Sequence, residues 1–289
     1  MPKVKPKNSP SVCIIGDGKT KSNVMLINEA SKKFSVFFAP INGIRLRLEK
    51  GGASVMHRNL DLRKFNVILP RIPNSYSGYA HQLLSLIPSN VYLPVKSFSF
   101  LACSGRFFMF NLLRKNNIPT IDLSLARSNK ASKNVFGEFE FPLIIRIPGK
   151  NTGIIAKSET EAKTIIDAIG SLGKSILIEK LDNSELVSIF IIGGKAFPFK
   201  KISPEKDMVF SKCEYKKISI KKDEEMTAFQ AVKTVKSQIA RVDMFMNPSR
   251  IANIVLNPSL SNIPNSDGTN VIESLTETLY DNYSKGEWG

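Results

Sequence analysis

The sequence predicts an α/β protein whose C-terminal part has an α+β arrangement. In the N-terminal third, a short apolar strand at 11–16 is followed by a helical segment at 22–32 and a second strand at 34–39. Another buried strand follows at 66–70, with the sequence NVILP. Strand, helix and strand in this order are typical of an open parallel sheet.

The C-terminal third instead shows two hairpins that come between helices. Apolar strands at 187–193 and 195–202 meet at Gly193-Gly194, and a second pair of strands contains Arg241-Val242-Asp243 and 253–257. A short glycine turn between apolar runs is a hairpin signal. The other expected elements are helices at 105–117, 158–170, 224–239 and 270–283 and strands at 141–147, 154–156 and 176–181.

The composition is that of a soluble globular protein with more than one compact unit. The chain has 289 residues, of which 42% are apolar and 23% are charged. We expect three units, at 1–95, 96–178 and 179–289, with the strand at 176–181 crossing into the last one. No apolar run reaches the roughly 18 residues of a membrane span, so we expect no membrane association. Residues 1–10 are basic but lead into a strand and not into a signal-peptide core.

Cysteine usage indicates a reducing compartment. The three cysteines, Cys13, Cys103 and Cys213, are far apart and follow no metal-binding spacing. An odd number of widely separated cysteines is typical of reduced thiols. We therefore expect a cytoplasmic protein.

The net charge of +16 is the strongest compositional signal. It predicts attraction to polyanions or to acidic substrates. Between residues 195 and 222 the chain has nine lysines and three acidic residues, a balance of +6. This segment is either a solvated basic face or part of a nucleic-acid surface, although it has no arginine to accompany its aromatic residues.

The turn after the first strand, Gly16-Asp17-Gly18-Lys19-Thr20, ends like a phosphate-binding P-loop. A P-loop also needs a glycine five residues before Gly18, and this chain has Cys13 there. A plain strand-to-helix turn is therefore the favoured interpretation. In the alternative one, Gly18 and Lys19 contact a ligand.

Asp243 and Asn257 are isolated polar residues in the second hairpin, and both carry hard oxygen donors of the type that magnesium takes. The residue two before Asn257 would share its face of a strand. That residue is Val255, which cannot bind a metal. The pattern is that of a phosphate–metal site with one ligand missing.

Several motifs follow one another in an order that identifies a family. They are Asn66-Val67-Ile68-Leu69-Pro70-Arg71-Ile72, Gly105-Arg106-Phe107, Asn117-Ile118-Pro119-Thr120, Phe141-Pro142-Leu143-Ile144-Ile145-Arg146, Ile178-Glu179-Lys180-Leu181 and the triad Asp243, Val255 and Asn257. In order and spacing, over nearly the whole chain, they resemble the ATP-grasp ligases, and most closely the RimK-type ribosomal-protein glutamate ligases. The resemblance implies an N-terminal pre-ATP-grasp domain with an open parallel sheet, followed by a two-lobed ATP-grasp domain.

The resemblance also implies which residues bind ATP. Arg106 and Arg146 stand where the family has phosphate-binding lysines, so a planar fork replaces a point charge. In the alternative interpretation, Arg106 is a surface charge at a helix start. Backbone groups of Glu179, Lys180 and Leu181 would hold adenine, and Glu179 would lie near the adenine or ribose.

The remaining implied site residues lie around the phosphates. The loop from Gly149 to Gly153 would close over them, or it is a surface hairpin. Magnesium would bind Asp243 and Asn257. Lys200 and Lys201 stand near the position of an arginine that faces the acyl-phosphate in the family, and they either take this catalytic role or are surface charges.

The implied chemistry is ATP-dependent carboxylate–amine ligation. A carboxylate attacks the γ-phosphate to give an acyl-phosphate, and an amine then displaces phosphate, with catalysis mainly by positioning and charge neutralisation. A basic cleft would suit glutamate, another acidic small molecule or an acidic protein segment. A homo-oligomer or a separate protein subunit is also consistent with the family.

Several positions depart from the family pattern. Val255 replaces a glutamate that would bridge two magnesium ions, and Gly105 stands where an aspartate is usual. Leu186 and Ser188 occupy the usual Asp-x-Arg positions, and the lysine-rich segment 204–222 replaces a glycine-rich loop.

Three functions remain open after these departures. The chain is an ATP-grasp ligase with an unusual metal site that uses ATP and magnesium. Alternatively, it is a degenerate member that binds an acidic protein, another subunit or nucleic acid and needs no cofactor. In the third interpretation it is a nucleic-acid-associated protein on the same fold.

Overall fold

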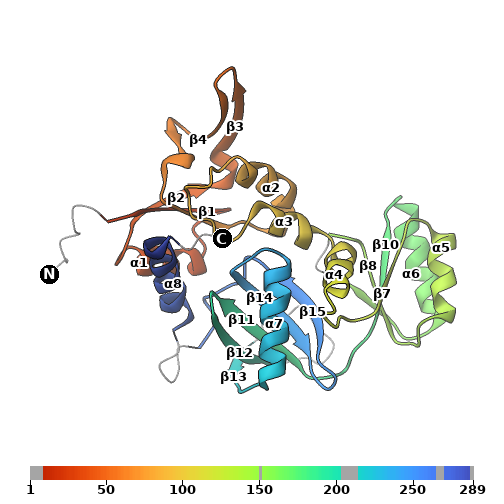
Figure 1. Cartoon of the computed structure of the whole chain (residues 1–289). Helices are drawn as coiled ribbons and strands as arrows, with labels where there is room; N and C mark the ends of the chain where they lie inside the picture. The colour runs from red at the N-terminus through yellow and green to blue at the C-terminus, as the bar shows by residue number, and fades with distance from the viewer. Residues whose placement is uncertain (1–8, 150–151, 203–213, 265–269, 287–289) are drawn as a thin grey trace.

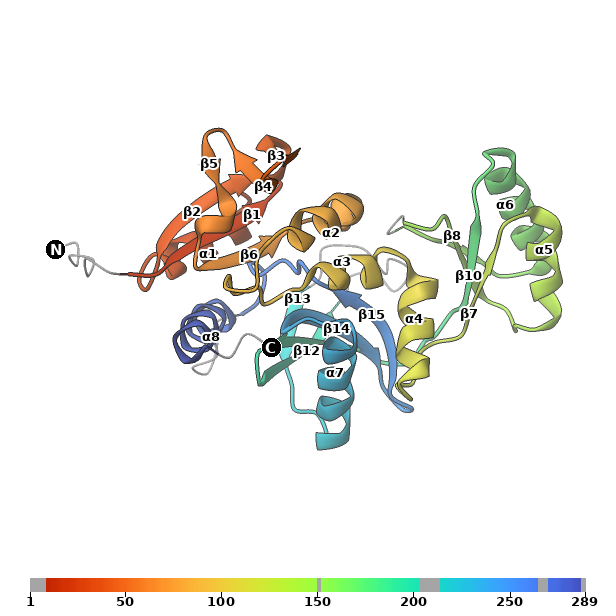
Figure 2. The same ribbon diagram turned by 45° about the horizontal axis from the view of Figure 1, so that its top comes forward.

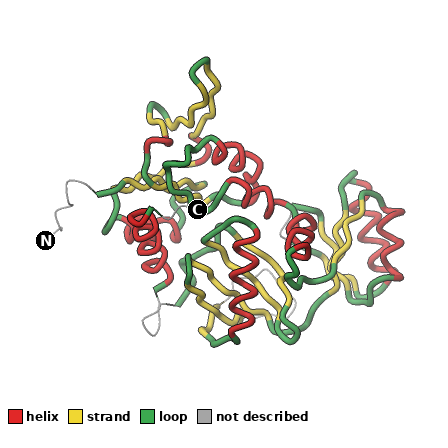
Figure 3. Tube along the Cα trace, viewed as in Figure 1, coloured by secondary structure: helices red, strands yellow, loops and turns green. Residues whose placement is uncertain are grey.

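The structure, a computed structural model, describes residues 9–149, 152–202, 214–264 and 270–286 (Figure 1). It contains a parallel N-terminal sheet, a small central sheet with helices beside it and a five-stranded C-terminal sheet (Figures 1 and 3). This arrangement confirms the predicted α/β class with an α+β C-terminal part. In the part of the chain described, no helix is both long and apolar enough to span a membrane.

The N-terminal sheet has strand order β2-β1-β6 and is parallel throughout, as predicted. Its elements are β1 (Ser11–Gly16), α1 (Lys21–Ala30), β2 (Ser35–Pro40) and β6 (Val67–Arg71). Thr20 begins α1 because its hydroxyl accepts a hydrogen bond from the backbone N–H of Asn23 at 3.3 Å. The preceding segment is therefore a strand-to-helix turn. Gly16 and Arg71 lie opposite each other at the carboxyl ends of β1 and β6. β1 is the central strand, and its neighbours β2 and β6 lie on opposite sides of it. In open parallel sheets, ligands bind at such a point.

A second three-stranded sheet, with antiparallel order β3-β4-β5, was not predicted from the sequence. Its elements are η1 (Ile41–Gly43), β3 (Ile44–Glu49), β4 (Gly52–His57), β5 (Leu60–Asp61) and η2 (Leu62–Lys64). The β3–β4 hairpin projects away from the rest of the chain (Figure 1). β3 is largely exposed, with Leu48 83% exposed, so its sequence carries little of the burial pattern that marks a strand.

Helices α2 to α4 lead from the N-terminal sheet to the remaining sheets. The elements are η3 (Asn74–Tyr76), α2 (Ser77–Ser85), α3 (Ser97–Ser104) and α4 (Arg106–Lys115). Extended backbone at Gly105 (φ −130°, ψ 123°) separates α3 from α4. α4 ends where expected, because Asn117 adopts a left-handed φ of 58° and Pro119 follows.

The central sheet is antiparallel, with order β7-β10-β8-β9. Its elements are β7 (Leu123–Ala126), α5 (Asn129–Lys133), η4 (Asn134–Gly137), β8 (Leu143–Arg146), β9 (Ile154–Ala156), α6 (Glu159–Ser171) and β10 (Ile176–Lys180). Ser158 caps α6 as predicted by accepting from Glu161 N at 3.3 Å, while the Glu161 carboxylate accepts from Lys157 N. β10 lies between β7 and β8, where Ile176 and Ile178 pack in this small core, and the chain continues from it into β11 of the C-terminal sheet.

The C-terminal sheet has order β13-β12-β11-β14-β15 and contains both predicted hairpins. Its elements are β11 (Leu186–Ile192), β12 (Lys195–Ile202), β13 (Glu214–Lys217), α7 (Lys222–Thr234), β14 (Ile239–Phe245) and β15 (Arg250–Val255). The helix expected at 224–239 is shorter, because Lys236 has a φ of 60° that a helix cannot contain. Ile239 therefore starts a strand and does not end a helix.

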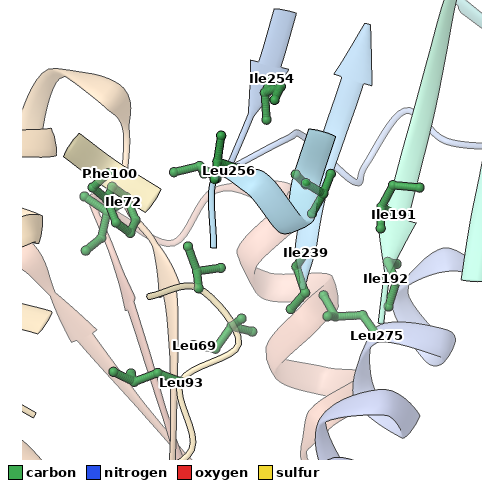
Figure 4. Close-up of a cluster of buried hydrophobic side chains, with 14 of the residues drawn as sticks. Leu69, Ile72, Leu93, Phe100, Ile191, Ile192, Ile239, Ile254, Leu256 and Leu275 are labelled. Atoms are coloured by element: carbon green, nitrogen blue, oxygen red, sulfur yellow. The ribbon is translucent and has the colours of Figure 1, made fainter. Parts of the chain in front are cut away.

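The C-terminal helix α8 (Val271–Lys285) returns to the N-terminal sheet and packs beside α1 (Figure 2). Tyr280 meets Phe34 edge to face, with ring centroids 5.6 Å apart. One hydrophobic core joins the N-terminal and C-terminal sheets, and Figure 4 shows Leu69, Phe100, Ile239 and Leu275 within it. Burying one such side chain stabilises the fold by about 1.5–3 kcal/mol.

The central sheet has a separate core, formed by residues between 135 and 178. In both views this sheet, with α5 and α6, lies to one side of the rest of the chain (Figures 1 and 2). The buried residues of α3 and α4 belong instead to the larger core. The expected domain boundaries near residues 95 and 178 stay predictions.

Candidate functional site

One face of the C-terminal sheet brings polar side chains from three strands together. Ser188 on β11, Asp243 on β14 and Asn253 on β15 lie opposite one another in register. Directly opposed residues point to the same face of a sheet. Arg241 and Val255 form the next opposed pair on this face, two residues along each strand.

Both carboxylate oxygens of Asp243 are engaged by neighbouring side chains. Ser188 Oγ donates to Oδ1 at 2.6 Å, and Arg241 Nη2 donates to Oδ2 at 2.9 Å. Arg241 is also hydrogen-bonded to the Tyr215 hydroxyl at 3.3 Å. Burial lowers the pKa of Arg241, but the Asp243 carboxylate and Tyr215 more than offset it, so the pKa is raised overall. Arg241 therefore stays charged and holds Asp243 in place.

Asn257 follows the end of β15 and has one side-chain atom without a partner. Its Nδ2 donates to the backbone oxygen of Arg71 at 3.0 Å. Its Oδ1 is buried and accepts no hydrogen bond from the described residues. A buried oxygen without a donor costs about 1–3 kcal/mol, and a bound cation would remove that cost.

Asp243 and Asn257 carry donor types that suit a single magnesium ion. One carboxylate and one amide oxygen, completed by phosphate oxygens and water, are a typical magnesium environment. The described part of the chain has no group of three or more His, Cys, Asp or Glu side chains that could hold a metal alone. Val255 lies where a second carboxylate would be needed, so the face does not fit a pair of magnesium ions.

Arg106 and Arg146, the two expected phosphate-binding cations, converge on one carboxylate. Arg106 Nε and Nη2 donate to the two oxygens of Glu179 at 2.5 and 3.1 Å, and Arg146 Nε donates to Glu179 Oε2 at 3.3 Å. The side chains of Arg106, Arg146 and Glu179 are 23%, 7% and 2% exposed. Burial lowers the pKa of Arg146, and the Glu179 carboxylate counteracts this. The cluster of two arginines and one glutamate keeps a net charge of +1.

Arg106 also connects this cluster to the C-terminal sheet. Its Nη1 lies 3.4 Å from Asn253 Oδ1, and its guanidinium lies 5.0 Å from the centre of the Phe110 ring. Asn253 is the residue opposite Asp243 in the sheet. The structure therefore brings Arg106 next to the strand pair that carries Asp243.

The segment expected to hold adenine lies at the end of β10. Glu179 pairs in register with Leu123 on one side and with Ile144 on the other. The Lys180 ammonium lies 2.9 Å from the exposed Glu140 carboxylate. The backbone N–H of Leu181 donates to Pro142 O at 3.1 Å, so a ligand that needs this N–H would have to replace that bond.

The loop from Gly149 to Gly153 is described at its two ends only, since residues 150–151 lie outside the described residues. Gly149 has a φ of 80°, which favours glycine. A Cβ on Gly153 would lie 2.7 Å from Ile144 Cγ2 and 3.0 Å from Arg146 Nη1. Gly153 therefore packs directly against the strand that carries Arg146.

Lys200 and Lys201 differ in where they lie relative to Asp243. Lys200 is opposite Val187, one residue out of step with Ser188, so it points to the other face of the sheet. Its ammonium pairs with Glu185 at 2.9 Å. Lys201 is opposite Tyr215, but its side chain lies outside the described residues.

Sequence reasoning missed Arg241 and Asn253 as members of this site. Arg241 precedes Asp243 by two residues, and this spacing alone places both on one face of a strand. Asn253 precedes Val255 by two residues, so the same alternation places it on this face, but its pairing with Asp243 depends on the β-bulge between β14 and β15.

The order of the sheets and the site on the C-terminal sheet define a protein of the ATP-grasp class. The sequence profile of the RimK-like ATP-grasp domain matches residues 103–279, which is more than half of the chain. The chain belongs to this family.

Solved structures support the same fold. The chain is similar to the ATP-grasp ligase PsnB complexed with a minimal precursor, with a TM-score of 0.76, 11% identity, and coverage of 94% of this chain and 98% of that one. It is also similar to D-alanine–D-alanine ligase from Bacillus anthracis complexed with ATP (TM-score 0.70, 15% identity, coverage 98% and 100%). The macrocyclase MdnC from Microcystis aeruginosa MRC, bound to its precursor peptide MdnA, gives a TM-score of 0.70 at 12% identity, with coverage of 94% and 99%. No curated protein matches this chain by sequence.

Proposed function

We propose that this protein is an ATP-dependent carboxylate–amine ligase that activates a carboxylate of an acidic substrate, such as glutamate or an acidic peptide segment. The carrying observation is the buried Asn257 Oδ1, which lacks a hydrogen-bond donor among the described residues, just beyond the strand that pairs with the one carrying Asp243. An acceptor of this kind can bind a cation, which would satisfy it. A magnesium–nucleotide site explains it.

In the proposed reaction a substrate carboxylate oxygen attacks the γ-phosphorus of ATP, and ADP leaves. An amine then attacks the acyl carbon, phosphate leaves, and the amine loses a proton. Asp243 and Asn257 would hold magnesium, which supplies charge neutralisation at the phosphates. Arg106 and Arg146 would bind phosphate oxygens through planar, paired hydrogen bonds. To do so they must exchange Glu179 for phosphate.

Arg241 is the first candidate for the residue that faces the acyl-phosphate in this reaction. It lies on the same face as Asp243, and its Nη2 donates to Asp243 Oδ2 at 2.9 Å. A guanidinium there would bind the developing charge of the acyl-phosphate. Lys200 lies on the other face, and Lys201 remains a second candidate.

The substrate class is supported by charge and by similar proteins. The net charge of +16 favours an acidic partner. PsnB and MdnC were solved with precursor peptides, which supports a peptide for this chain as well. We also propose a cytoplasmic location, supported by the free thiols of Cys13 and Cys103. Nucleic acid stays a further prediction, since residues 203–213 of the basic segment lie outside the described residues.

A second candidate function is that of a binding subunit without catalysis. Two observations favour it. Val255, opposite Arg241, supplies no metal ligand. Arg106 and Arg146 are both already paired with Glu179. In this case the cationic side chains of Arg106, Arg146 and Arg241 would hold an acidic segment of a partner protein. Homo-oligomer formation is compatible with either function.

The two functions are separated by turnover. The purified protein is incubated with ATP, magnesium and either glutamate or an acidic peptide, in the presence of hydroxylamine. ADP and hydroxamate formed only with the acidic substrate would support the ligase, because hydroxylamine traps an acyl-phosphate. Loss of this signal in Arg146→Gln, but not in the exposed control Arg127→Gln, would assign it to the cleft. Absence of ATP binding in calorimetry, with and without magnesium, would rule the ligase out, and ATP binding without turnover would favour the binding subunit.

A further inference from the structure

Arg71, the last residue of β6, is a buried cation with only uncharged hydrogen-bond partners. It is 3% exposed, and its side-chain partners among the described residues are the Asn23 amide, the Ser22 hydroxyl and the backbone oxygen of Pro258. Burial lowers its pKa to about 10, and the nearby charge of Asp17 counteracts this in part. Arg71 therefore remains charged at neutral pH. A buried charge without a counter-ion is costly, so its hydrogen bonds must have a structural or functional reason.

The guanidinium of Arg71 joins the N-terminal sheet to the segment that follows β15. Its Nη2 donates to Pro258 O at 2.7 Å and to Ser22 Oγ at 3.2 Å. Ser22 Oγ in turn accepts from the backbone N–H of Leu260 at 3.0 Å. Arg71 of the N-terminal sheet and Ser22 of α1 thus hold the backbone on the two sides of Ser259.

The same residue also sets the orientation of the Asn257 amide. The backbone oxygen of Arg71 accepts from Asn257 Nδ2 at 3.0 Å. A carbonyl oxygen can only accept, so the amino group of Asn257 must face Arg71. The amide oxygen is then directed to the other side, where it is buried and has no donor among the described residues.

We propose that Arg71 and Ser22 are positioning residues, which fix the turn at 257–260 so that the Asn257 amide oxygen is directed at the metal of the nucleotide site. This proposal rests on the proposed function, because it assumes that Asn257 binds magnesium. Neither residue touches the metal. The N-terminal sheet then contributes to the metal site across 186 residues of sequence, through the Arg71–Asn257 hydrogen bond.

The strand itself gives Asn257 no comparable support. β15 ends at Val255, and Asn257 lies beyond its last pairing with β14. Without Arg71 and Ser22, the backbone after Asn257 would lose the bonds to Pro258 O and Leu260 N. Partners of this kind typically change metal affinity by about 10- to 100-fold when they are removed.

The test measures binding of Mn²⁺ to the protein–ATP complex by electron paramagnetic resonance, with ATP affinity in EDTA measured in parallel. The variants are Arg71→Met, Arg71→Lys and the milder Ser22→Ala. Matched controls in the same N-terminal part are Arg63→Met, whose arginine pairs with Asp61, and Ser31→Ala, at the other end of α1.

We expect Ser22→Ala and Arg71→Met to weaken Mn²⁺ binding by about 10-fold or more, with metal-free ATP affinity unchanged and with Arg71→Lys intermediate. The positioning role would be overturned if wild type and Ser22→Ala bound Mn²⁺ equally well. It would also be overturned if a variant lost Mn²⁺ binding and metal-free ATP binding in parallel. Neither outcome would bear on the proposed metal site. If the wild type binds ATP without Mn²⁺, or binds neither, the proposed metal site itself is wrong.

Discussion

Replacing Glu179 by glutamine should weaken the fold and strengthen phosphate binding at the same time. The substitution keeps the shape of the side chain but removes the charge that Arg106 and Arg146 share. Removing one partner of a buried ion pair costs about 3–5 kcal/mol. The Arg106 side chain is 23% exposed and can return to water, whereas that of Arg146 is 7% exposed. We therefore expect a loss at the lower end, about 3 kcal/mol.

A loss of this size should lower the melting temperature by about 6 °C or more, since each kcal/mol corresponds to about 2–4 °C in proteins of 150–250 residues. ATP affinity should rise, because phosphate no longer competes with a carboxylate for Arg106 and Arg146. A unit charge 4 Å from phosphate is worth about 4 kcal/mol near a protein surface. Even if desolvation offsets most of this, a gain of about 10-fold remains.

The assays are differential scanning fluorimetry and calorimetric titration of ATP in EDTA. The control is Glu140→Gln, which removes an exposed carboxylate that pairs with Lys180 on the same lobe. Exposed pairs contribute about 0–1 kcal/mol, so this variant should match the wild type. If Glu179→Gln lost stability and ATP affinity together, the Glu179 carboxylate would be a ligand contact. Our reasoning that it masks the arginines would then be refuted.

Three further outcomes are expected. Val255→Glu should raise magnesium-dependent nucleotide affinity by about 10-fold, because it adds a hard carboxylate ligand. The uncharged Val255→Gln is the control. Equal nucleotide affinities of Val255→Glu and Val255→Gln would show that the face does not bind metal. Gly153→Ala should destabilise the protein by about 1–3 kcal/mol in urea unfolding, since its Cβ would lie 2.7 Å from Ile144, whereas Gly137→Ala in the same lobe meets open space. Cys13 should resist iodoacetamide at pH 8 until the protein unfolds, because burial raises its thiol pKa; rapid native-state labelling in peptide mass spectrometry would contradict this.

The elements with strong periodic burial were predictable from the sequence. β1, β6 and the two C-terminal hairpins read correctly because their apolar runs are local and bounded by glycine or proline. The β3–β4 hairpin was missed because β3 and the turn that follows it are largely exposed. The predicted end of α7 was wrong because the left-handed residue that follows the helix is Lys236 and not the glycine that usually occupies such a position.

The sequence by itself determined the fold class, the family and the gap at Val255, because these depend on the order and spacing of residues along the chain. Only the tertiary structure decided what those residues contact. Glu179 reaches Arg106 over 73 residues, and Asn257 reaches Arg71 over 186. Such contacts arise when packing brings distant segments together and buried polar groups must find partners, and neither periodicity nor spacing records which partner each one finds.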